Sequence, residues 1–179
     1  MKIICISGYA QHGKDTAASL LRYLLQGREK RVLITHYGDL LKYICKEFFG
    51  WDGNKDTRGR SILQYVGTDV VRQKRPEYWV DFLVGIFEMF GDNWDYVLIP
   101  DCRFPNEIEL LKKYGFDVTT IRIFRPNFDN GLTDEQKAHP SETAMDGYDF
   151  DYTIENPGNL GEFNFILADW MSKNISKEG

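Results

Sequence analysis

The chain has 179 residues, the size of one domain, so we treat residues 1–179 as a single unit. Its net charge of −5 argues against a nucleic-acid polymer or an anionic membrane as the main partner, because both favour proteins with a basic face. The three cysteines lack metal-ligand spacing, and no apolar run resembles a signal peptide or a membrane span. We therefore expect a reduced, cytoplasmic protein that acts on small molecules. A homodimer is compatible with the sequence, which leaves the number of subunits open.

Along the chain, short apolar runs alternate with helical spacing of apolar residues. The runs predict buried strands at residues 3–6, 32–34, 96–99, 118–124 and 152–154. The helical spacing predicts helices over residues 17–25, 41–48, 62–70, 79–90, 105–114 and 160–171. This alternation predicts an α/β fold of three layers, in which a five-stranded, mainly parallel sheet carries helices on both faces.

Two segments interrupt the alternation. A helical insert at about residues 39–92 lies between the second and third strands and contains a polar loop at residues 52–60. A polar stretch at about residues 126–140 follows the fourth strand. We expect the insert to bind an acceptor substrate and the polar stretch to form a small mobile lid.

The loop after the first strand carries the clearest chemical signal. It matches the pattern G-x-x-x-x-G-K in the strand–loop–helix context of a phosphate-binding loop, and so predicts the P-loop NTPase fold. Gly8 and Gly13 allow the backbone to approach a phosphate, and Lys14 supplies charge to the transferring group from a solvent-filled site. We expect Gln11 and His12 to set the loop shape and to contact solvent or nucleotide.

The position after the lysine, which is usually Ser or Thr, is occupied by Asp15, and Thr16 follows. Either residue is a candidate ligand for Mg²⁺, directly or through water, or Asp15 faces the acceptor. Asp101 at the end of the third strand is a further magnesium candidate, or else it caps a helix ahead of Pro105. Asp39, just past the second strand, either caps a helix or reaches the acceptor.

Several blocks in this order resemble the phage-type deoxynucleoside monophosphate kinases, and together they span nearly the whole chain. They are Gly13-Lys14-Asp15-Thr16, Gly38-Asp39-Leu40-Leu41-Lys42, Val66-Gly67-Thr68-Asp69-Val70-Val71-Arg72, Asp101-Cys102-Arg103-Phe104-Pro105-Asn106-Glu107, His139-Pro140-Ser141-Glu142 and Tyr152-Thr153-Ile154-Glu155-Asn156.

The resemblance implies transfer of the γ-phosphoryl group from ATP·Mg²⁺ to the 5′-phosphate of a deoxynucleoside monophosphate. That acceptor is already an anion, so no general base is needed, and catalysis consists of positioning and charge neutralisation.

The arginines are then the informative residues. Arg72 is expected to grip the acceptor phosphate, and Thr68 and Asp69, one turn before it, are expected to bind the acceptor as well. Arg103 is expected to act in catalysis and, with Asn106 and Glu107, to contact the acceptor. Two further arginines are candidates for reaching the ATP phosphates when the lid closes, namely Arg122 and Arg125.

Two rival functions stay open at this point. The first is phosphoryl transfer to another small molecule, such as the 3′-hydroxyl of dephospho-coenzyme A, for which Asp39 is placed to act as base. The second is a nucleotide-binding module without transfer activity. A guanine-reading N-K-x-D motif is missing, since the similar run at residues 54–57 ends in Thr57.

Overall fold

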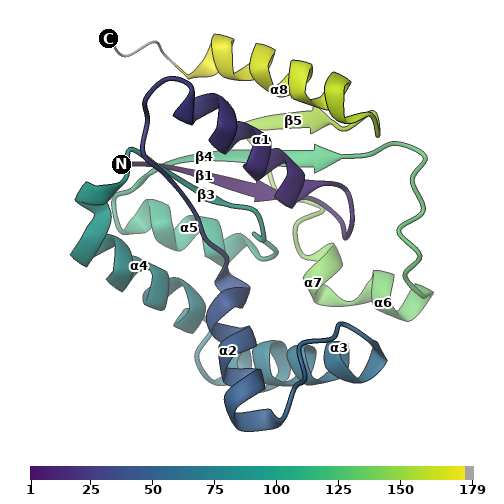
Figure 1. Cartoon of the computed structure of the whole chain (residues 1–179). Coiled ribbons are helices and arrows are strands. Elements are labelled where there is room, and N and C mark those ends of the chain that lie inside the picture. Colours follow the sequence, from purple (N-terminus) through teal and green to yellow (C-terminus); the bar gives the residue numbers. More distant parts are fainter. Residues whose placement is uncertain (176–179) are drawn as a thin grey trace.

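The computed structural model describes residues 1–175 and has a parallel β-sheet at its centre (Figure 1). Its five strands lie in the order β2-β3-β1-β4-β5, and every neighbouring pair is parallel. The strands are β1 (Lys2–Ser7), β2 (Val32–Ile34), β3 (Tyr96–Ile99), β4 (Asp117–Phe124) and β5 (Tyr152–Glu155). All five predicted strands are confirmed, and the sheet is wholly parallel.

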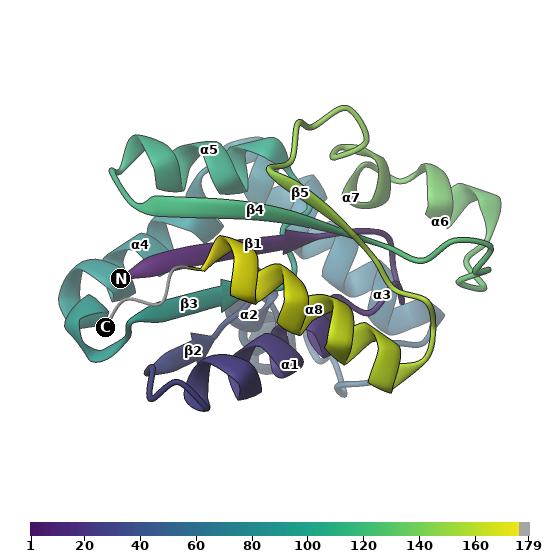
Figure 2. The same cartoon turned by 90° about the horizontal axis from the view of Figure 1, so that it is seen from above.

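Helices cover both faces of the sheet. On one face lie α1 (Lys14–Gln26) and α8 (Leu160–Asn174), and on the other lie α4 (Tyr78–Phe90) and α5 (Pro105–Lys113) (Figures 1 and 2). Alternate residues of β1 explain the three layers, because successive strand side chains point to opposite faces. Ile3 and Cys5 join the apolar cluster beneath α4 and α5, whereas Ile4 and Ile6 join the cluster beneath α1 and α8.

The predicted insert between β2 and β3 is helical. It contains α2 (Tyr37–Phe49), α3 (Thr57–Gln64), the π-helix η1 (Tyr65–Arg72), α4 and the short 3₁₀ helix η2 (Gly91–Asn93). The polar loop predicted at residues 52–60 is wrong in its second half, because α3 begins at Thr57. The Asp56 side chain caps that helix by accepting a hydrogen bond from Gly59 N at 2.7 Å.

The insert is tied to the sheet at the end of β3. Both carboxylate oxygens of Asp101 accept hydrogen bonds from the first turn of α2, from Tyr37 N at 3.0 Å and Gly38 N at 2.9 Å. Asp101 therefore satisfies N–H groups that a helix leaves without intrahelical partners.

The polar stretch at residues 126–140 has more regular structure than its sequence suggests. It runs into two short helices, α6 (Asp134–Ala138) and α7 (Pro140–Thr143), which Figure 1 shows beside the carboxyl ends of β1 and β4. Thr133 and Gln136 form a reciprocal cap at the start of α6, and His139 caps α7. Within residues 1–175, the helices are all too short or too polar to cross a membrane.

Candidate active site

The loop between β1 and α1 has the backbone geometry that its glycines predicted. Gly8 and Gly13 adopt φ values of +143° and +96°, which other residues rarely reach. A Cβ atom at Gly8 would lie 2.3 Å from Ile123 O, and one at Gly13 would lie 2.5 Å from Asn156 Nδ2. Both positions therefore require glycine for space as well as for conformation.

His12 supports this loop from behind, in contrast to the predicted contact with solvent or nucleotide. Its ring is buried, and Nδ1 accepts a hydrogen bond from Arg125 N at 3.0 Å. Asn156 Nδ2 donates to the His12 carbonyl oxygen at 2.9 Å. Burial lowers the pKa of His12, so the ring serves as a neutral support for the loop. Gln11, by contrast, is exposed and donates to Asn130 O.

The sequence predicted that Lys14 points into a solvent-filled site, but the structure buries this side chain. It is 7% exposed, and Nζ donates to Gly8 O at 2.8 Å and to Tyr9 O at 2.7 Å. Removal of the ammonium from water lowers the pKa of Lys14 to about 8. The loop thus holds a cation that is poorly solvated in the absence of an anion.

A cavity of about 490 Å³ opens beside Lys14, within the range of small-molecule sites. Its wall combines the phosphate-binding loop, the start of α2, the α3–η1 region, the β3–α5 loop and α7. We call it the main cavity. The predicted site residues that line it are Gln11, Lys14, Asp15, Thr68, Arg72, Asp101, Arg103 and Glu107. The predicted residues outside this lining are Gly8, His12, Gly13, Thr16, Asp39, Asp69, Asn106 and Arg125.

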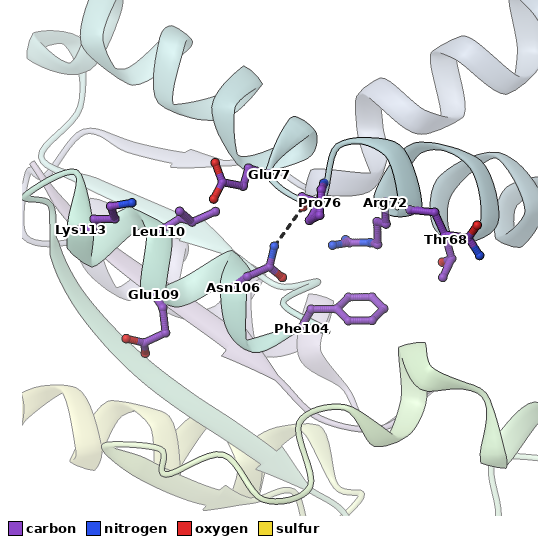
Figure 3. A pocket seen from close by; sticks show the side chains of 10 residues that line it. Thr68, Arg72, Pro76, Glu77, Phe104, Asn106, Glu109, Leu110 and Lys113 are labelled. Carbon is purple, nitrogen blue, oxygen red and sulfur yellow. Dashed lines mark hydrogen bonds between the residues drawn. The ribbon is translucent and has the colours of Figure 1, made fainter.

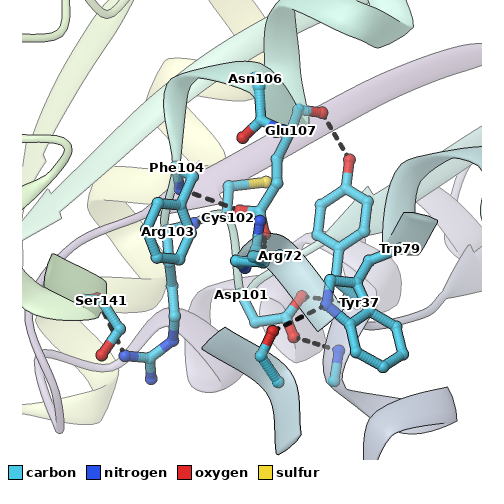
Figure 4. Close-up of polar contacts among 12 residues, drawn as sticks. Tyr37, Arg72, Trp79, Asp101, Cys102, Arg103, Phe104, Asn106, Glu107 and Ser141 are labelled. Atoms are coloured by element: carbon cyan, nitrogen blue, oxygen red, sulfur yellow. Dashed lines mark hydrogen bonds and ion pairs between the residues drawn. The ribbon is translucent and has the colours of Figure 1, made fainter. Parts of the chain in front are cut away.

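Two arginines from different segments meet at this cavity (Figure 4). Arg72, from η1, forms an ion pair with the fully buried Glu107, and its guanidinium stacks 4.0 Å from the centre of the Phe104 ring. Arg103, from the β3–α5 loop, donates from Nη1 to Ser141 O at 3.1 Å and to Glu142 Oε1 at 2.5 Å.

Glu142 is a site residue that the sequence reasoning missed. Its second carboxylate oxygen accepts a hydrogen bond from Ala10 N of the phosphate-binding loop at 2.9 Å. Glu142 therefore joins α7, Arg103 and the loop. The block from His139 to Glu142 was noted in the sequence only as part of the family resemblance. No local pattern indicates that Glu142 contacts the phosphate-binding loop.

A histidine links two of the candidate carboxylates. His36 Nε2 lies 3.0 Å from Asp15 Oδ1, and His36 Nδ1 lies 3.1 Å from Asp39 Oδ2. The hydrogen bond with Asp15 raises the pKa of His36 and lowers that of Asp15. Asp39 also pairs with Lys42 at 2.8 Å, so its carboxylate is held at the surface of α2 beside the main cavity.

A second hollow lies on the other side of Arg72, between the end of η1 and α5 (Figure 3). It measures about 510 Å³, and we call it the side groove. Thr68, Arg72 and Phe104 border both hollows. Asn106 lines the side groove and not the main cavity, and it donates to Pro76 O at 2.9 Å.

Arg122, near the end of β4, and Arg125, just after that strand, lie outside the main cavity. The Arg125 guanidinium stacks 4.0 Å from the centre of the Phe128 ring. Arg122 pairs with Asp146 at 2.8 Å, and its guanidinium lies 5.1 Å from the centre of the Tyr9 ring. Both residues are therefore engaged near the loop without facing the cavity in this conformation.

A parallel sheet, a phosphate-binding loop after β1 and a cation-lined cavity with a helical insert define a kinase of the P-loop class. The Campylobacter jejuni dephospho-CoA kinase has a similar fold, with a TM-score of 0.54 and 11% sequence identity over 96% of each chain.

The family model for deoxynucleotide monophosphate kinase matches residues 43–166. A putative deoxynucleotide monophosphate kinase of Acanthamoeba polyphaga mimivirus is 30% identical over 190 residues, which cover 91% of this chain and 92% of the relative. The deoxynucleotide monophosphate kinase of Enterobacteria phage T4 is 30% identical over 105 residues, which cover 58% of this chain and 41% of the phage protein. The chain belongs to the deoxynucleotide monophosphate kinase family and is a nucleotide monophosphate kinase.

Proposed function

We propose that this protein transfers the γ-phosphoryl group of ATP·Mg²⁺ to the 5′-phosphate of a deoxynucleoside monophosphate. The observation that carries the proposal is the lining of the main cavity, which includes Lys14 of the phosphate-binding loop together with Arg72 and Arg103. A donor phosphate on the loop and an acceptor phosphate near the arginines would then face each other across one cavity.

On the donor side, the loop binds the ATP phosphates through backbone N–H groups at the start of α1. Lys14 is already desolvated there, and its charge acts on the phosphoryl group in a medium that screens weakly. The residues proposed for this side are Gly8, Gln11, Gly13, Lys14, Asp15 and Thr16.

On the acceptor side, the insert at about residues 39–92 supplies one arginine and the β3–α5 loop supplies the other. Arg72 grips the acceptor phosphate, and Arg103 bridges towards the transferring group. The guanidinium geometry suits phosphate oxygens, and two fixed arginines neutralise charge that builds up between two anions. The acceptor phosphate is itself the nucleophile, so the proposal assigns no general base.

Mg²⁺ fits the oxygen donors of this cavity. Asp15 and Asp101 both line the main cavity, whereas the Thr16 side chain is exposed outside it. Residues 1–175 contain no cluster of three or more acidic, histidine or cysteine side chains able to hold a metal. Mg²⁺ in kinases is commonly held by one or two carboxylates together with substrate phosphates, whose charge it neutralises. Asp15 and Asp101 are the residues proposed for that role.

The test is a coupled ADP-release assay with ATP·Mg²⁺ across deoxy- and ribonucleoside monophosphates. We expect ADP release to require a deoxynucleoside monophosphate and to fall on the order of 10²–10⁴-fold in Lys14→Ala, with the fold retained. Dephospho-coenzyme A serves as the control acceptor. Acceleration by that compound and not by deoxynucleotides would overturn the proposal, as would unchanged turnover in folded Lys14→Ala.

A further inference from the structure

Glu107 is a buried carboxylate on the first turn of α5, and it has more partners than a helix cap needs. The side chain is 1% exposed. One carboxylate oxygen accepts from Arg103 N at 2.5 Å and Phe104 N at 3.0 Å, and the other pairs with Arg72 Nη2. A single buried group thus contacts the segments that carry both arginines of the main cavity (Figure 4).

The negative charge of Glu107 is not explained by capping. Glutamate and glutamine are both suited to the third position of a helix cap, and only the neutral amide avoids the desolvation penalty of a buried charge. Burial raises the pKa of Glu107, which reflects this penalty, and Arg72 opposes it. The contact that requires a carboxylate is therefore the one with Arg72.

Arg72 is held on two sides as a result. Glu107 engages one end of its guanidinium, and Phe104 covers one face. Phe104 is itself fixed by the hydrogen bond from its N–H to Glu107 at 3.0 Å. Since the Arg72 side chain is only 15% exposed, few orientations are left to it, and it borders both hollows.

Arg103 is fixed by the same carboxylate through its backbone. The 2.5 Å hydrogen bond from Arg103 N sets where its side chain leaves the β3–α5 loop, and that side chain then reaches Glu142. Arg72 belongs to the insert and Arg103 to the β3–α5 loop, so Glu107 joins the two parts of the molecule beside the cavity that both arginines line.

We propose that Glu107 is a positioning residue that sets the spacing of Arg72 and Arg103 for the acceptor phosphate, without itself touching the substrate. The inference rests on the proposed function, because it assigns both arginines to phosphoryl transfer. A misplacement of catalytic groups by about 1 Å is enough to reduce turnover about 100-fold. A residue that fixes the spacing of the two arginines would therefore have a large effect on turnover.

The test is Glu107→Gln. The amide oxygen can still accept from Arg103 N and Phe104 N, so the cap is retained, but the amide N–H₂ group then faces the Arg72 guanidinium and repels it. We expect kcat/KM for the deoxynucleotide to fall about 10- to 100-fold, while KM for ATP stays within about twofold. The matched control is Glu109→Gln on the same helix, where an exposed glutamate pairs with Lys112; its constants should equal those of the wild type.

A second measurement separates positioning from stability. In the Glu107→Gln, Arg72→Ala double variant, the loss of kcat/KM should be smaller than the product of the single losses, because the two side chains act together. Glu107→Asp keeps the charge but falls short of Arg72, and it should show the same selective loss in a milder form. Glu107→Asp also provides the test of positioning if the Glu107→Gln protein does not fold.

The outcomes distinguish the two proposals. Wild-type protein that does not phosphorylate any deoxynucleotide overturns the proposed function. Active wild-type protein, together with variants that melt at a lower temperature but keep wild-type acceptor constants, overturns only the role of Glu107. An equal rise in KM for ATP and for the acceptor also overturns it, since the proposed effect is confined to the acceptor side.

Discussion

Lys14 gives the most quantitative prediction, because its charge state is coupled to nucleotide binding. In the ligand-free protein, burial lowers its pKa from 10.5 to about 8. A bound phosphate supplies the opposite charge that the site lacks, and so restores the pKa towards or above its ordinary value. Above pH 8, nucleotide binding must therefore be accompanied by proton uptake at Nζ.

The size of the effect follows from linkage. At pH 8.5, about three quarters of the free protein carries a neutral Lys14, so binding should take up about 0.7 proton per nucleotide. The affinity for ATP should weaken by up to about tenfold for each pH unit above 8. The sign for folding is opposite: the unfolded chain keeps this proton up to pH 10.5, so the contribution of Lys14 to stability improves as the pH rises from about 8 towards 10.5.

Isothermal titration calorimetry at pH 8.5, in two buffers with different ionisation enthalpies, measures the proton uptake directly. Lys14→Met is the control, because it removes this titration and leaves any contribution from other groups. We expect uptake in the wild type and a much smaller value in Lys14→Met. Equal uptake in the two proteins, or affinity for ATP that does not change between pH 8 and pH 9.5, would refute the reasoning.

Three further perturbations test other parts of the site. Arg72→Ala should raise KM for the monophosphate on the order of 10-fold more than it raises KM for ATP, and Arg72→Lys should restore KM only partly. Steady-state kinetics with each substrate varied measures both constants, and equal rises would give Arg72 a structural role instead. Gly13→Ala forces a Cβ against Asn156 at a positive φ and should lower the free energy of unfolding by about 1–3 kcal/mol in urea titrations, whereas an unchanged midpoint would contradict the strain. A bisubstrate analogue should protect residues 126–140 from amide exchange, and protection of the phosphate-binding loop alone would leave this segment a surface connection.

The fold could be predicted because its signals are local. Continuous apolar runs marked all five strands, and alternate residues of one run, such as Ile3 and Ile4, supplied both faces of the sheet. Gly8 and Gly13 were readable for the same reason, since a positive φ and a close backbone approach leave glycine as the residue that fits. Helix ends that no glycine or proline marks were harder to predict. The helix α3 follows its capping residue Asp56 and begins within residues 52–60, which were predicted to be a loop.

The site was less predictable because its contacts join residues far apart in the chain. Glu107 was expected to touch the substrate, and nothing in the sequence indicated its ion pair with Arg72, which is 35 positions away in the chain. Glu142 reaches Ala10 across 132 positions. The apolar spacing at residues 62–70 predicted a helix but not the π-helical geometry of η1, in which a Cβ at Gly67 would lie 2.7 Å from Leu41 Cδ2.

The charges of the main cavity also resolve how an acidic protein can bind anionic substrates. Three of the cations there already have oxygen partners: Lys14 has loop carbonyls, Arg72 has Glu107, and Arg103 has Glu142. The partners differ in how firmly they are held. Glu107 is buried against the main cavity, so we expect Arg72 to keep this partner when an anion binds and to present its other N–H groups. Glu142 belongs to the short helix α7 and occupies an N–H of the phosphate-binding loop, a group of the kind that phosphates use. We therefore expect nucleotide binding to exchange oxygen ligands around Lys14 and Arg103. A negative net charge over the rest of the surface should not oppose that local exchange, because it is screened over about 10 Å.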